Sequence, residues 1–154
     1  MNLQHINILL ADDDSDDCLL FKEALEELPL SASLTVVNDG EQLMQLLLKE
    51  NDGLPHVLFL DLNMPRKNGF ECLSEIKLHP KLNPLTVIIF STSFEPDIVN
   101  QLYKNGAHYY IRKPVEFCKL KNVIHQALIL LSQENTSQPD PEHFVLKGEI
   151  HVLS

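Results

Sequence analysis

The sequence predicts an α/β protein with a doubly wound (βα)5 fold, in which a five-stranded parallel sheet has the strand order 2-1-3-4-5. Short runs of aliphatic and β-branched residues alternate five times with longer segments of helical periodicity. The runs that start at Val57 and Thr86 are almost continuously apolar, which indicates strands buried on both faces of a parallel sheet. Regular alternation of this length favours a doubly wound sheet, for which 2-1-3-4-5 is a common order.

The first two strand and helix pairs are expected in the first third of the chain. A strand over residues 6–10 precedes a helix that ends before Pro29, because proline cannot continue a helix. The apolar face of this helix contains Cys18, Phe21, Leu25 and Leu28. A second strand over residues 34–37 precedes a helix over residues 41–49.

The remaining three pairs follow the same pattern. Strands are expected over residues 57–60, 86–90 and 108–111, and the next two helices over residues 70–78 and 96–104. Pro96 suits the first position of its helix. The last helix has an apolar face made of Phe117, Leu120, Ile124, Ala127 and Leu131. The glycines at positions 40, 53, 69 and 106 are expected between elements.

Length and composition predict one folded domain over residues 1–131, followed by a linker and C-terminal tail over residues 132–154. The chain has 154 residues and is 44% hydrophobic, which suffices for one core. Residues 132–141 are polar and contain prolines, whereas the last stretch regains apolar residues and is expected to dock on its own domain or on a dimer mate. The three cysteines, Cys18, Cys72 and Cys118, lack metal-ligand or redox spacing and are expected to be reduced and partly buried.

Charge and hydropathy exclude two classes of partner. The formal net charge is -10 and the 12 basic residues are scattered, which argues against direct binding to nucleic acid. No apolar run approaches the roughly 20 residues that span a bilayer, so no membrane association is expected. We therefore expect a cytoplasmic protein.

Five acidic residues crowd into positions 12–17, directly after the first strand. Asp14 as a helix N-cap, with Asp16 and Asp17 in the first turn, explains three of them. Asp12 and Asp13 have no such explanation, and two carboxylates about 4 Å apart repel by roughly 4 kcal/mol at an effective dielectric near 20. A divalent cation with oxygen ligands is the leading candidate for their counter-charge.

Polar residues end the other central strands as well. Asp61 follows the third strand, and the predicted order places it beside Asp12 and Asp13. A hard cation would relieve the repulsion among three carboxylates and leave an oxygen of Asp61 free to act as a nucleophile. Ser91 ends the fourth strand and Lys113 follows the fifth, so a hydroxyl and an ammonium are expected at the same edge. Such a set suits phosphoryl transfer.

Over about residues 6–131 the chain resembles the receiver domains of two-component response regulators, which have the CheY-like, flavodoxin-like fold. Four motifs carry the resemblance: residues 8–13 (ILLADD), residues 61–65 (DLNMP) with Gly69 four positions later, Ser91-Thr92, and Lys113-Pro114. The resemblance implies that Asp61 is the phosphoacceptor, modified to 4-aspartylphosphate. It also implies a Mg²⁺ site formed by Asp12, Asp13, Asp61 and the backbone carbonyl of Asn63.

The resemblance further assigns roles to the residues around the phosphoacceptor. Lys113 resembles the lysine that contacts the phosphoryl group, Ser91 the hydroxyl residue that responds to it, and Tyr110 the switch aromatic. Asp61, Lys113 and Ser91 would then form the catalytic set, and Ser91 with Tyr110 the switch. The Lys113-Pro114 peptide bond is implied to be cis. Pro65 and Gly69 are expected to shape the loop that carries Asn63, because proline fixes its φ angle and glycine relaxes it.

The implied function is that of a stand-alone phosphoacceptor in a phosphorelay. The phosphoryl donor would be a sensor histidine kinase or a histidine phosphotransfer protein, and the chain would catalyse only its own phosphorylation and dephosphorylation, not turnover. Its output face, the fourth helix with the fifth strand and fifth helix, is also a candidate homodimer interface, and the downstream target is open. The acidic cluster and residues 91–93 resemble single-domain regulators paired with phytochrome-type kinases.

Two other functions use similar residues. A metal-dependent phosphatase of the haloacid dehalogenase type also has an aspartate nucleophile at a strand end, but it places a second acid two residues later, where this chain has Asn63. A flavodoxin-like cofactor binder is disfavoured because Asp12 and Asp13 would repel a flavin phosphate.

Overall fold

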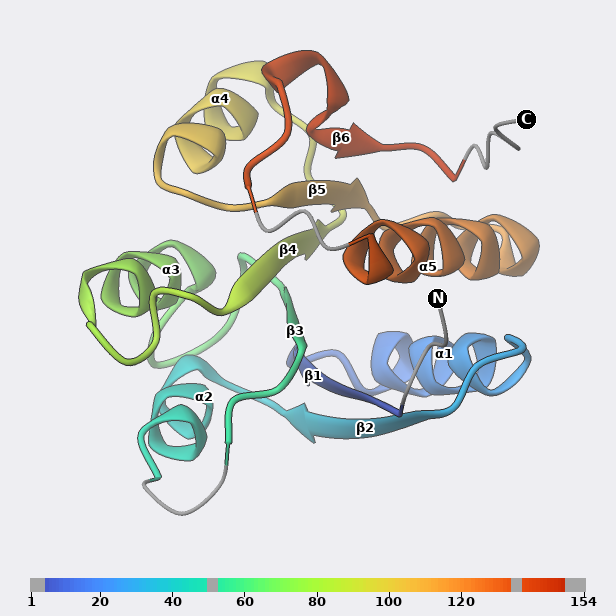
Figure 1. Cartoon of the computed structure of the whole chain (residues 1–154), viewed down its shortest axis with the longest axis horizontal. Helices are drawn as coiled ribbons and strands as arrows, with labels where there is room; N and C mark the ends of the chain where they lie inside the picture. Colours follow the sequence, from blue (N-terminus) through green and yellow to red (C-terminus); the bar gives the residue numbers. More distant parts are fainter. Residues whose placement is uncertain (1–4, 50–52, 134–136, 149–154) are drawn as a thin grey trace.

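Five strand and helix pairs follow one another along the chain, as the sequence predicts. The computed structural model describes residues 5–49, 53–133 and 137–148 (Figure 1). The elements are β1 (Ile6–Ala11), α1 (Ser15–Glu26), β2 (Ala32–Val37), α2 (Gly40–Leu47), β3 (Val57–Leu60), α3 (Gly69–Leu78), β4 (Thr86–Ser91), α4 (Pro96–Lys104), β5 (Tyr109–Arg112), α5 (Phe117–Ser132), a 3-10 turn (Pro141–His143) and β6 (Val145–Leu146). Only β3 and α4 have the predicted bounds, and the other ends shift slightly.

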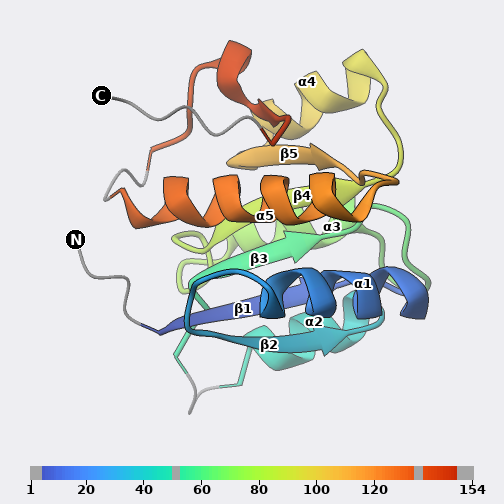
Figure 2. The same ribbon diagram turned by 90° about the vertical axis from the view of Figure 1, so that its right-hand side faces the viewer.

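The strands form one parallel sheet in the order β2-β1-β3-β4-β5-β6. The predicted order 2-1-3-4-5 is confirmed, and β6 adds a sixth strand that the sequence analysis did not predict. Helices α1 and α5 cover one face of the sheet, and α2, α3 and α4 cover the other (Figures 1 and 2). The carboxyl ends of β1, β3, β4 and β5 therefore point to the same edge.

The two faces of the sheet bury separate apolar clusters. Under α1 and α5, Phe21, Phe59 and Phe90 pack edge to face, with ring centroids 4.9, 5.5 and 6.3 Å apart. Aromatic pairs in this geometry stabilise a core beyond the area that they bury. Every residue of β3 is buried, which agrees with its unbroken apolar sequence. The central strands are thus packed on both faces, which fixes the positions of the residues at their carboxyl ends.

The described part of the C-terminal segment, residues 137–148, packs on its own domain beside β5. The Tyr110 amide donates to the Phe144 carbonyl at 2.9 Å, and Tyr110 and Ile111 pair in register with Val145 and Leu146. Phe144 is 1% exposed, and its ring lies 5.1 Å from the ring of Tyr103 on α4. The tail was expected to dock, and it does so on the edge of β5. The predicted boundary at residue 131 stays a prediction.

Hydrogen bonds also attach this segment to both neighbouring helices. The Tyr103 hydroxyl donates to the Pro139 carbonyl at 2.6 Å. The side-chain Nε2 of Gln138 donates to the carbonyl oxygens of Tyr103 and Ala107 at 2.6 and 2.7 Å. On the α5 side, the Gly148 amide donates to Gln126 Oε1 at 2.9 Å. The segment therefore bridges α4 and α5 across the end of the sheet.

Two glycines predicted between elements are instead the first residues of helices. Gly40 begins α2 and Gly69 begins α3. A Cβ on Gly69 would lie 2.8 Å from the Leu62 Cα, and one on Gly40 would lie 2.6 Å from the Lys67 Cβ. Gly69 is therefore needed for close approach to the loop after β3 and not, as predicted, to relax φ. The residue with positive φ in this loop is Arg66, at 69°.

The longest described helix is α5, with 16 residues. Of its predicted apolar face, Leu120, Ile124 and Ala127 are buried, and Phe117 and Leu131 are partly buried. Cys118 is exposed, which contradicts the expectation of a partly buried thiol. Each residue of a helix is rotated by about 100° from the previous one, so Cys118, two residues before Leu120, points away from the face that contains Leu120 and Ile124. No helix in the described ranges is both long enough and apolar enough to cross a membrane.

Candidate functional site

Hydrogen bonds just beyond the ladders of the sheet place the site residues side by side. The Asp61 amide donates to the Ala11 carbonyl at 2.9 Å, and the Lys113 amide donates to the Ser91 carbonyl at 2.8 Å. Each bond extends parallel pairing by one residue past the end of a strand. Asp61 is thereby held next to Asp12, and Lys113 next to Ser91, at the carboxyl edge of the sheet.

Three carboxylates meet at this edge. One carboxylate oxygen from each of Asp12, Asp13 and Asp61 lies within 4.8 Å of the others. Asp12 is fully buried and Asp61 is 5% exposed, whereas Asp13 faces solvent. A set of hard oxygen donors with one side open to water fits a divalent cation, which usually keeps several water ligands in such sites. The structure thus brings together the three carboxylates of the predicted metal site.

Asp14 caps α1, as predicted. Its side chain accepts hydrogen bonds from the amides of Asp16 and Asp17 at 2.9 and 3.1 Å. The Asp14 amide in turn donates to Asp12 Oδ1 at 3.0 Å. The turn between β1 and α1 therefore fixes the Asp12 carboxylate as well as the start of the helix.

Lys113 is the counter-charge of the acidic cluster. Its Nζ lies 2.8 Å from Asp12 Oδ2, 2.9 Å from Asp17 Oδ2 and 3.5 Å from Asp61 Oδ2. Burial alone would lower the pKa of Lys113, but its hydrogen bonds to Asp12 and Asp17 outweigh burial and hold that pKa above the ordinary value. The ammonium is therefore charged at every physiological pH, and it links the first and last strand ends of the site.

Asp17 is the site residue that sequence reasoning missed. The sequence analysis explained it as an acid in the first turn of a helix, and its contact with Lys113 spans 96 positions of the chain. The available signal was its place in the first turn of α1, three residues after Asp14.

Asp61 lies in an environment that disfavours its charge. Burial, opposed by Lys113 and reinforced by Asp12, raises the pKa of Asp61 from 3.8 to about 6. The Asn63 amide donates to Asp61 Oδ1 at 3.4 Å, and the Asn63 side chain is exposed. The loop thus brings the Asn63 backbone to the phosphoacceptor candidate, while the role of its carbonyl stays a prediction.

Ser91 and Tyr110 are connected through Ser93. Ser91 is fully buried, and its Oγ accepts a hydrogen bond from the Ser93 amide at 3.2 Å. The Tyr110 hydroxyl donates to the Ser93 carbonyl. The Tyr110 ring is also fully buried, with its centroid 6.0 Å from that of Phe94 and 6.3 Å from that of Phe144. Any shift of the loop after β4 therefore changes the surroundings of Tyr110.

The peptide bond between Lys113 and Pro114 is trans, in contrast to the cis bond that the resemblance implies, since none of the described peptide bonds is cis. Before proline the two isomers differ by only about 0.5–1 kcal/mol, so local sequence does not fix the choice.

Asp61→Asn is expected to stabilise the metal-free protein at pH 7 by roughly 1–3 kcal/mol. The folded protein keeps a proton on Asp61 up to about pH 6, whereas the unfolded chain releases it near 3.8. Between these values the folded state binds more protons, so stability falls as pH rises, and the asparagine removes that loss. Urea unfolding at pH 4 and pH 7 with a chelator measures the effect. Asp97→Asn, on an exposed residue of α4, is the control; an equal pH response in both variants would contradict the prediction.

Comparison with known proteins gives the same assignment for most of the chain. The family model described as "Response regulator receiver domain" matches residues 8–125. Response regulator Rcp1 of Synechocystis sp. is 34% identical over 110 residues, which cover 69% of this chain and 75% of Rcp1. The probable methanogenesis regulatory protein FilR2 of Methanothrix harundinacea is 32% identical over 122 residues, covering 77% of this chain and 79% of FilR2.

Solved structures agree in fold. The phosphorylated cyanobacterial phytochrome response regulator RcpA superposes with a TM-score of 0.78 at 30% identity, covering 89% of this chain and all of RcpA. The Mn²⁺-bound form of Rcp1 superposes with a TM-score of 0.73 at 30% identity, covering 87% of this chain and 99% of Rcp1. A relative of this chain thus holds a divalent cation, and another carries a phosphoryl group.

Proposed function

Because the chain belongs to the response regulator receiver domain family, we propose that Asp61 is the residue on which it accepts a phosphoryl group. The chain is a phosphoacceptor response regulator and not an enzyme that turns over a separate substrate. The observation that carries the assignment to Asp61 is its position beside the acidic pair and within 3.5 Å of Lys113 Nζ. Asp12, Asp13, Asp61 and the Asn63 carbonyl are the proposed ligands of Mg²⁺.

In the proposed reaction, a carboxylate oxygen of Asp61 attacks the phosphorus of a phosphohistidine on the partner. A phosphorus-oxygen bond forms as the phosphorus-nitrogen bond breaks, and the histidine nitrogen leaves with the bonding pair and takes a proton. Bound Mg²⁺ would supply charge compensation for the phosphoryl oxygens. Lys113 would offset the same charge, because its ammonium lies 3.5 Å from Asp61 Oδ2 and is held there by Asp12 and Asp17.

The proposed response to phosphorylation runs from Ser91 to Tyr110. A phosphoryl group on Asp61 offers strong acceptors to the Ser91 hydroxyl and to Lys113. If Ser91 turns toward the phosphoryl group, its bond with the Ser93 amide breaks, and the Ser93 carbonyl that receives the Tyr110 hydroxyl shifts with the loop. The hydrogen bonds between these three residues support the proposal that Ser91 and Tyr110 form the switch.

Receiver domains receive phosphoryl groups from histidine kinases, and we propose a kinase or histidine phosphotransfer protein in the cytoplasm as the donor. A phytochrome-type kinase is the more specific proposal. It is supported by the likeness to RcpA, a cyanobacterial phytochrome response regulator, and to the bacteriophytochrome response regulator RtBRR, which has a TM-score of 0.71 at 31% identity. The output face of α4, β5 and α5, its use in a homodimer and the downstream target stay predictions.

Intact mass spectrometry after incubation with acetyl phosphate tests the proposed function. The wild-type chain should gain one phosphoryl group only when Mg²⁺ is present, since the buried carboxylate needs charge compensation, and Asp61→Asn should gain none. Asp97→Asn changes an exposed carboxylate of α4 and should gain the group as the wild type does. A phosphoryl group on Asp61→Asn, or a gain that is unaffected by a chelator, would refute the assignment.

A further inference from the structure

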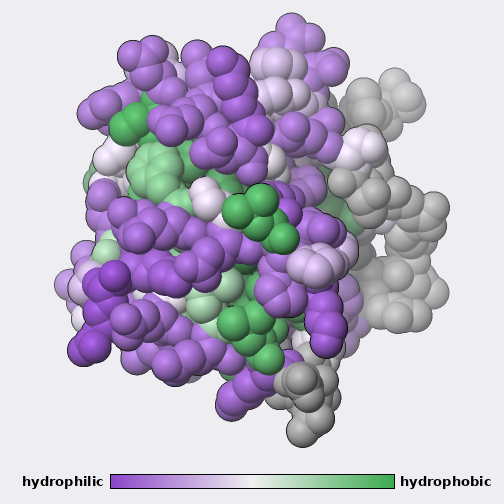
Figure 3. Space-filling view, turned by 90° about the vertical axis from the view of Figure 1, so that its left-hand side faces the viewer, coloured by the Kyte–Doolittle hydropathy of each residue, from purple (hydrophilic) through white to green (hydrophobic). Residues whose placement is uncertain are grey.

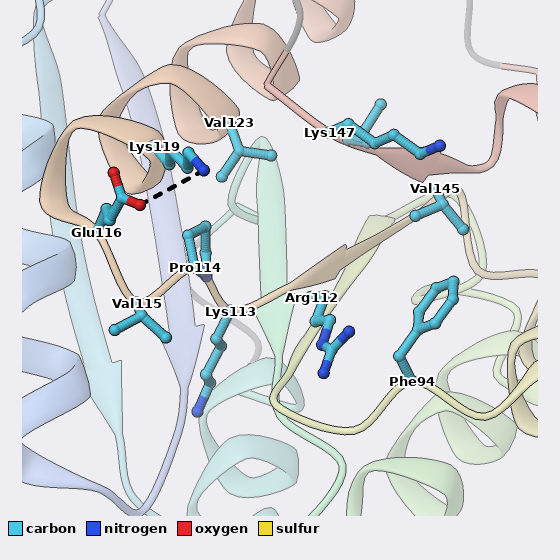
Figure 4. A pocket seen from close by; sticks show the side chains of 11 residues that line it. Phe94, Arg112, Lys113, Pro114, Val115, Glu116, Lys119, Val123, Val145 and Lys147 are labelled. Carbon is cyan, nitrogen blue, oxygen red and sulfur yellow. Dashed lines mark ion pairs between the residues drawn. The ribbon is translucent and has the colours of Figure 1, made fainter.

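A groove of about 510 Å³ opens where the C-terminal segment meets the rest of the fold (Figure 4). Residues from three stretches line it: 112–116 with Lys119 and Val123 around the start of α5, β6 with Lys147, and Phe94 in the loop after β4. Since β6 forms one wall, docking of the C-terminal segment on β5 creates the groove.

The groove combines apolar contact surface with positive charge. Val115 is fully exposed and Phe94 is 42% exposed, and both line it together with Pro114, Val123, Val145 and Leu146. Its charged residues are four bases and one acid: Arg112, Lys113, Lys119, Lys147 and Glu116. Lys113 is already paired with acids of the candidate site. The other three bases still outnumber Glu116, and on a chain with a net charge of -10 this local excess of positive charge favours an acidic ligand.

Several of these charges are available to a ligand. Among the residues that the structure describes, Lys119 forms an ion pair only with Glu116, at 3.5 Å between two exposed side chains, and such pairs are weak. Within the described ranges, Arg112 and Lys147 form no ion pair with any side chain. The Arg112 guanidinium lies 6.0 Å from the centre of the Phe94 ring, and Figure 4 shows the two side chains beside each other in the groove.

The start of α5 adds to the positive potential of the groove. No side chain caps this 16-residue helix at Glu116, and its first turn contains no acidic residue. The amide groups of a first helical turn carry partial positive charge, which carboxylates neutralise when they bind there. The helix start and the bases of the rim thus favour the same ligand chemistry.

We propose that this groove docks an acidic segment with apolar side chains from a partner protein. Apolar side chains of the segment would cover Val115 and Phe94, and its carboxylates would pair with Arg112, Lys119 and Lys147. The outer edge of β6 can also pair with an extended backbone, because β6 is the last strand of the described sheet. By contrast, the face of α2, α3 and α4 is largely hydrophilic, with separated apolar residues (Figure 3).

Docking should respond to phosphorylation, and this step rests on the proposed function. Lys113 lines the groove and contacts Asp61, while Phe94 packs against Tyr110 with ring centroids 6.0 Å apart. A phosphoryl group that draws Lys113 and the loop after β4 toward Asp61 therefore reshapes two parts of the groove. Since coupling is reciprocal, a ligand that prefers the phosphorylated form stabilises that form to the same extent.

Fluorescence anisotropy with two pools of short labelled peptides tests the docking. In one pool apolar positions alternate with Asp or Glu, and in the other with Lys or Arg. The acidic pool should bind the full chain about tenfold more tightly than the basic pool, a difference of about 1.4 kcal/mol. Lys119→Glu with Lys147→Glu should abolish that preference. Lys22→Glu with Lys81→Glu, which reverses the same number of exposed charges outside the groove, should keep it.

Four results would overturn the proposal. Equal binding of both pools, or unchanged binding by the groove variant, would exclude an acidic segment as ligand. Recruitment to phosphatidylglycerol vesicles without peptide binding would assign the charge to a lipid surface. A dimer in analytical ultracentrifugation that the groove variant dissociates would make the ligand a second copy of the chain.

The failure of docking and the failure of the proposed function are distinguishable. Peptide binding is measured first without acetyl phosphate, and phosphorylation is followed separately by intact mass. Binding to the acidic pool in a chain that gains no phosphoryl group would support the groove and refute the phosphoacceptor. Gain of a phosphoryl group without any preference for acidic peptides would support the phosphoacceptor and refute docking in the groove.

Discussion

Lys113→Met is expected to destabilise the metal-free protein by about 3–5 kcal/mol at neutral pH, because it leaves buried carboxylates without their counter-charge. The Lys113 side chain is 9% exposed, and it contacts Asp12, Asp17 and Asp61 at 2.8, 2.9 and 3.5 Å. Methionine fills most of the same space, so lost packing contributes little. Urea unfolding at pH 7 in a chelator measures the loss.

Two comparisons separate this electrostatic effect from a general defect. Adding Mg²⁺ should restore part of the lost stability, since a cation bound by the same carboxylates replaces the missing charge. Lys67→Met removes the ion pair with Glu75 on the surface, and it should be much less destabilising than Lys113→Met, because exposed ion pairs contribute little to stability. If Lys113→Met were no more destabilising than Lys67→Met, the ammonium would not be what balances the acidic cluster.

Phe144→Ala is expected to detach the C-terminal segment from β5 and to destabilise the protein by about 3–5 kcal/mol. The loss cannot exceed the free energy with which the segment docks, because a detached segment loses no further contacts. Phe144 is 1% exposed and its ring packs between those of Tyr103 and Tyr110, at 5.1 and 6.3 Å. Hydrogen exchange at the Tyr110 amide reports docking directly, because that amide donates to the Phe144 carbonyl.

The control for this variant is Leu78→Ala, which truncates a side chain that is 84% exposed and should change stability by no more than about 0.5 kcal/mol. Unchanged protection of the Tyr110 amide in Phe144→Ala would show that the strand pairing, and not the aromatic contact, holds the segment. Because β6 lines the groove, the same variant should also weaken binding of acidic peptides.

Periodicity predicted the first five strands and the five helices, because each of these elements contains several consecutive residues with an unbroken hydrophobic pattern. Asp12, Asp13, Asp61, Ser91 and Lys113 could be placed together because a parallel sheet brings the carboxyl ends of its strands to one edge. Asp17 could not, since its role depends on where a lysine 96 positions away points its side chain.

The other failures have a similar cause. Two residues, Val145 and Leu146, give no periodicity by themselves, so β6 is a strand only because the edge of β5 is there to pair with. Gly69 is required by the backbone of Leu62, a contact that no local pattern encodes. A long-range contact is thus predictable where the strand order brings the two residues together, as for Asp12 and Lys113, and not where it depends on the direction of a single side chain or on local backbone packing.

The pairing of β5 with β6 also affects how the protein is made. Tyr110 leaves the ribosome well before Val145, its partner in the ladder, because Val145 follows 35 positions later in the sequence. At a translation rate of about 5–20 residues per second, the backbone groups on the edge of β5 stay unpaired for roughly 2–7 s. During that interval the nascent chain presents an open strand beside the Tyr110 ring, so chaperones and premature strand partners compete with β6 for the same edge.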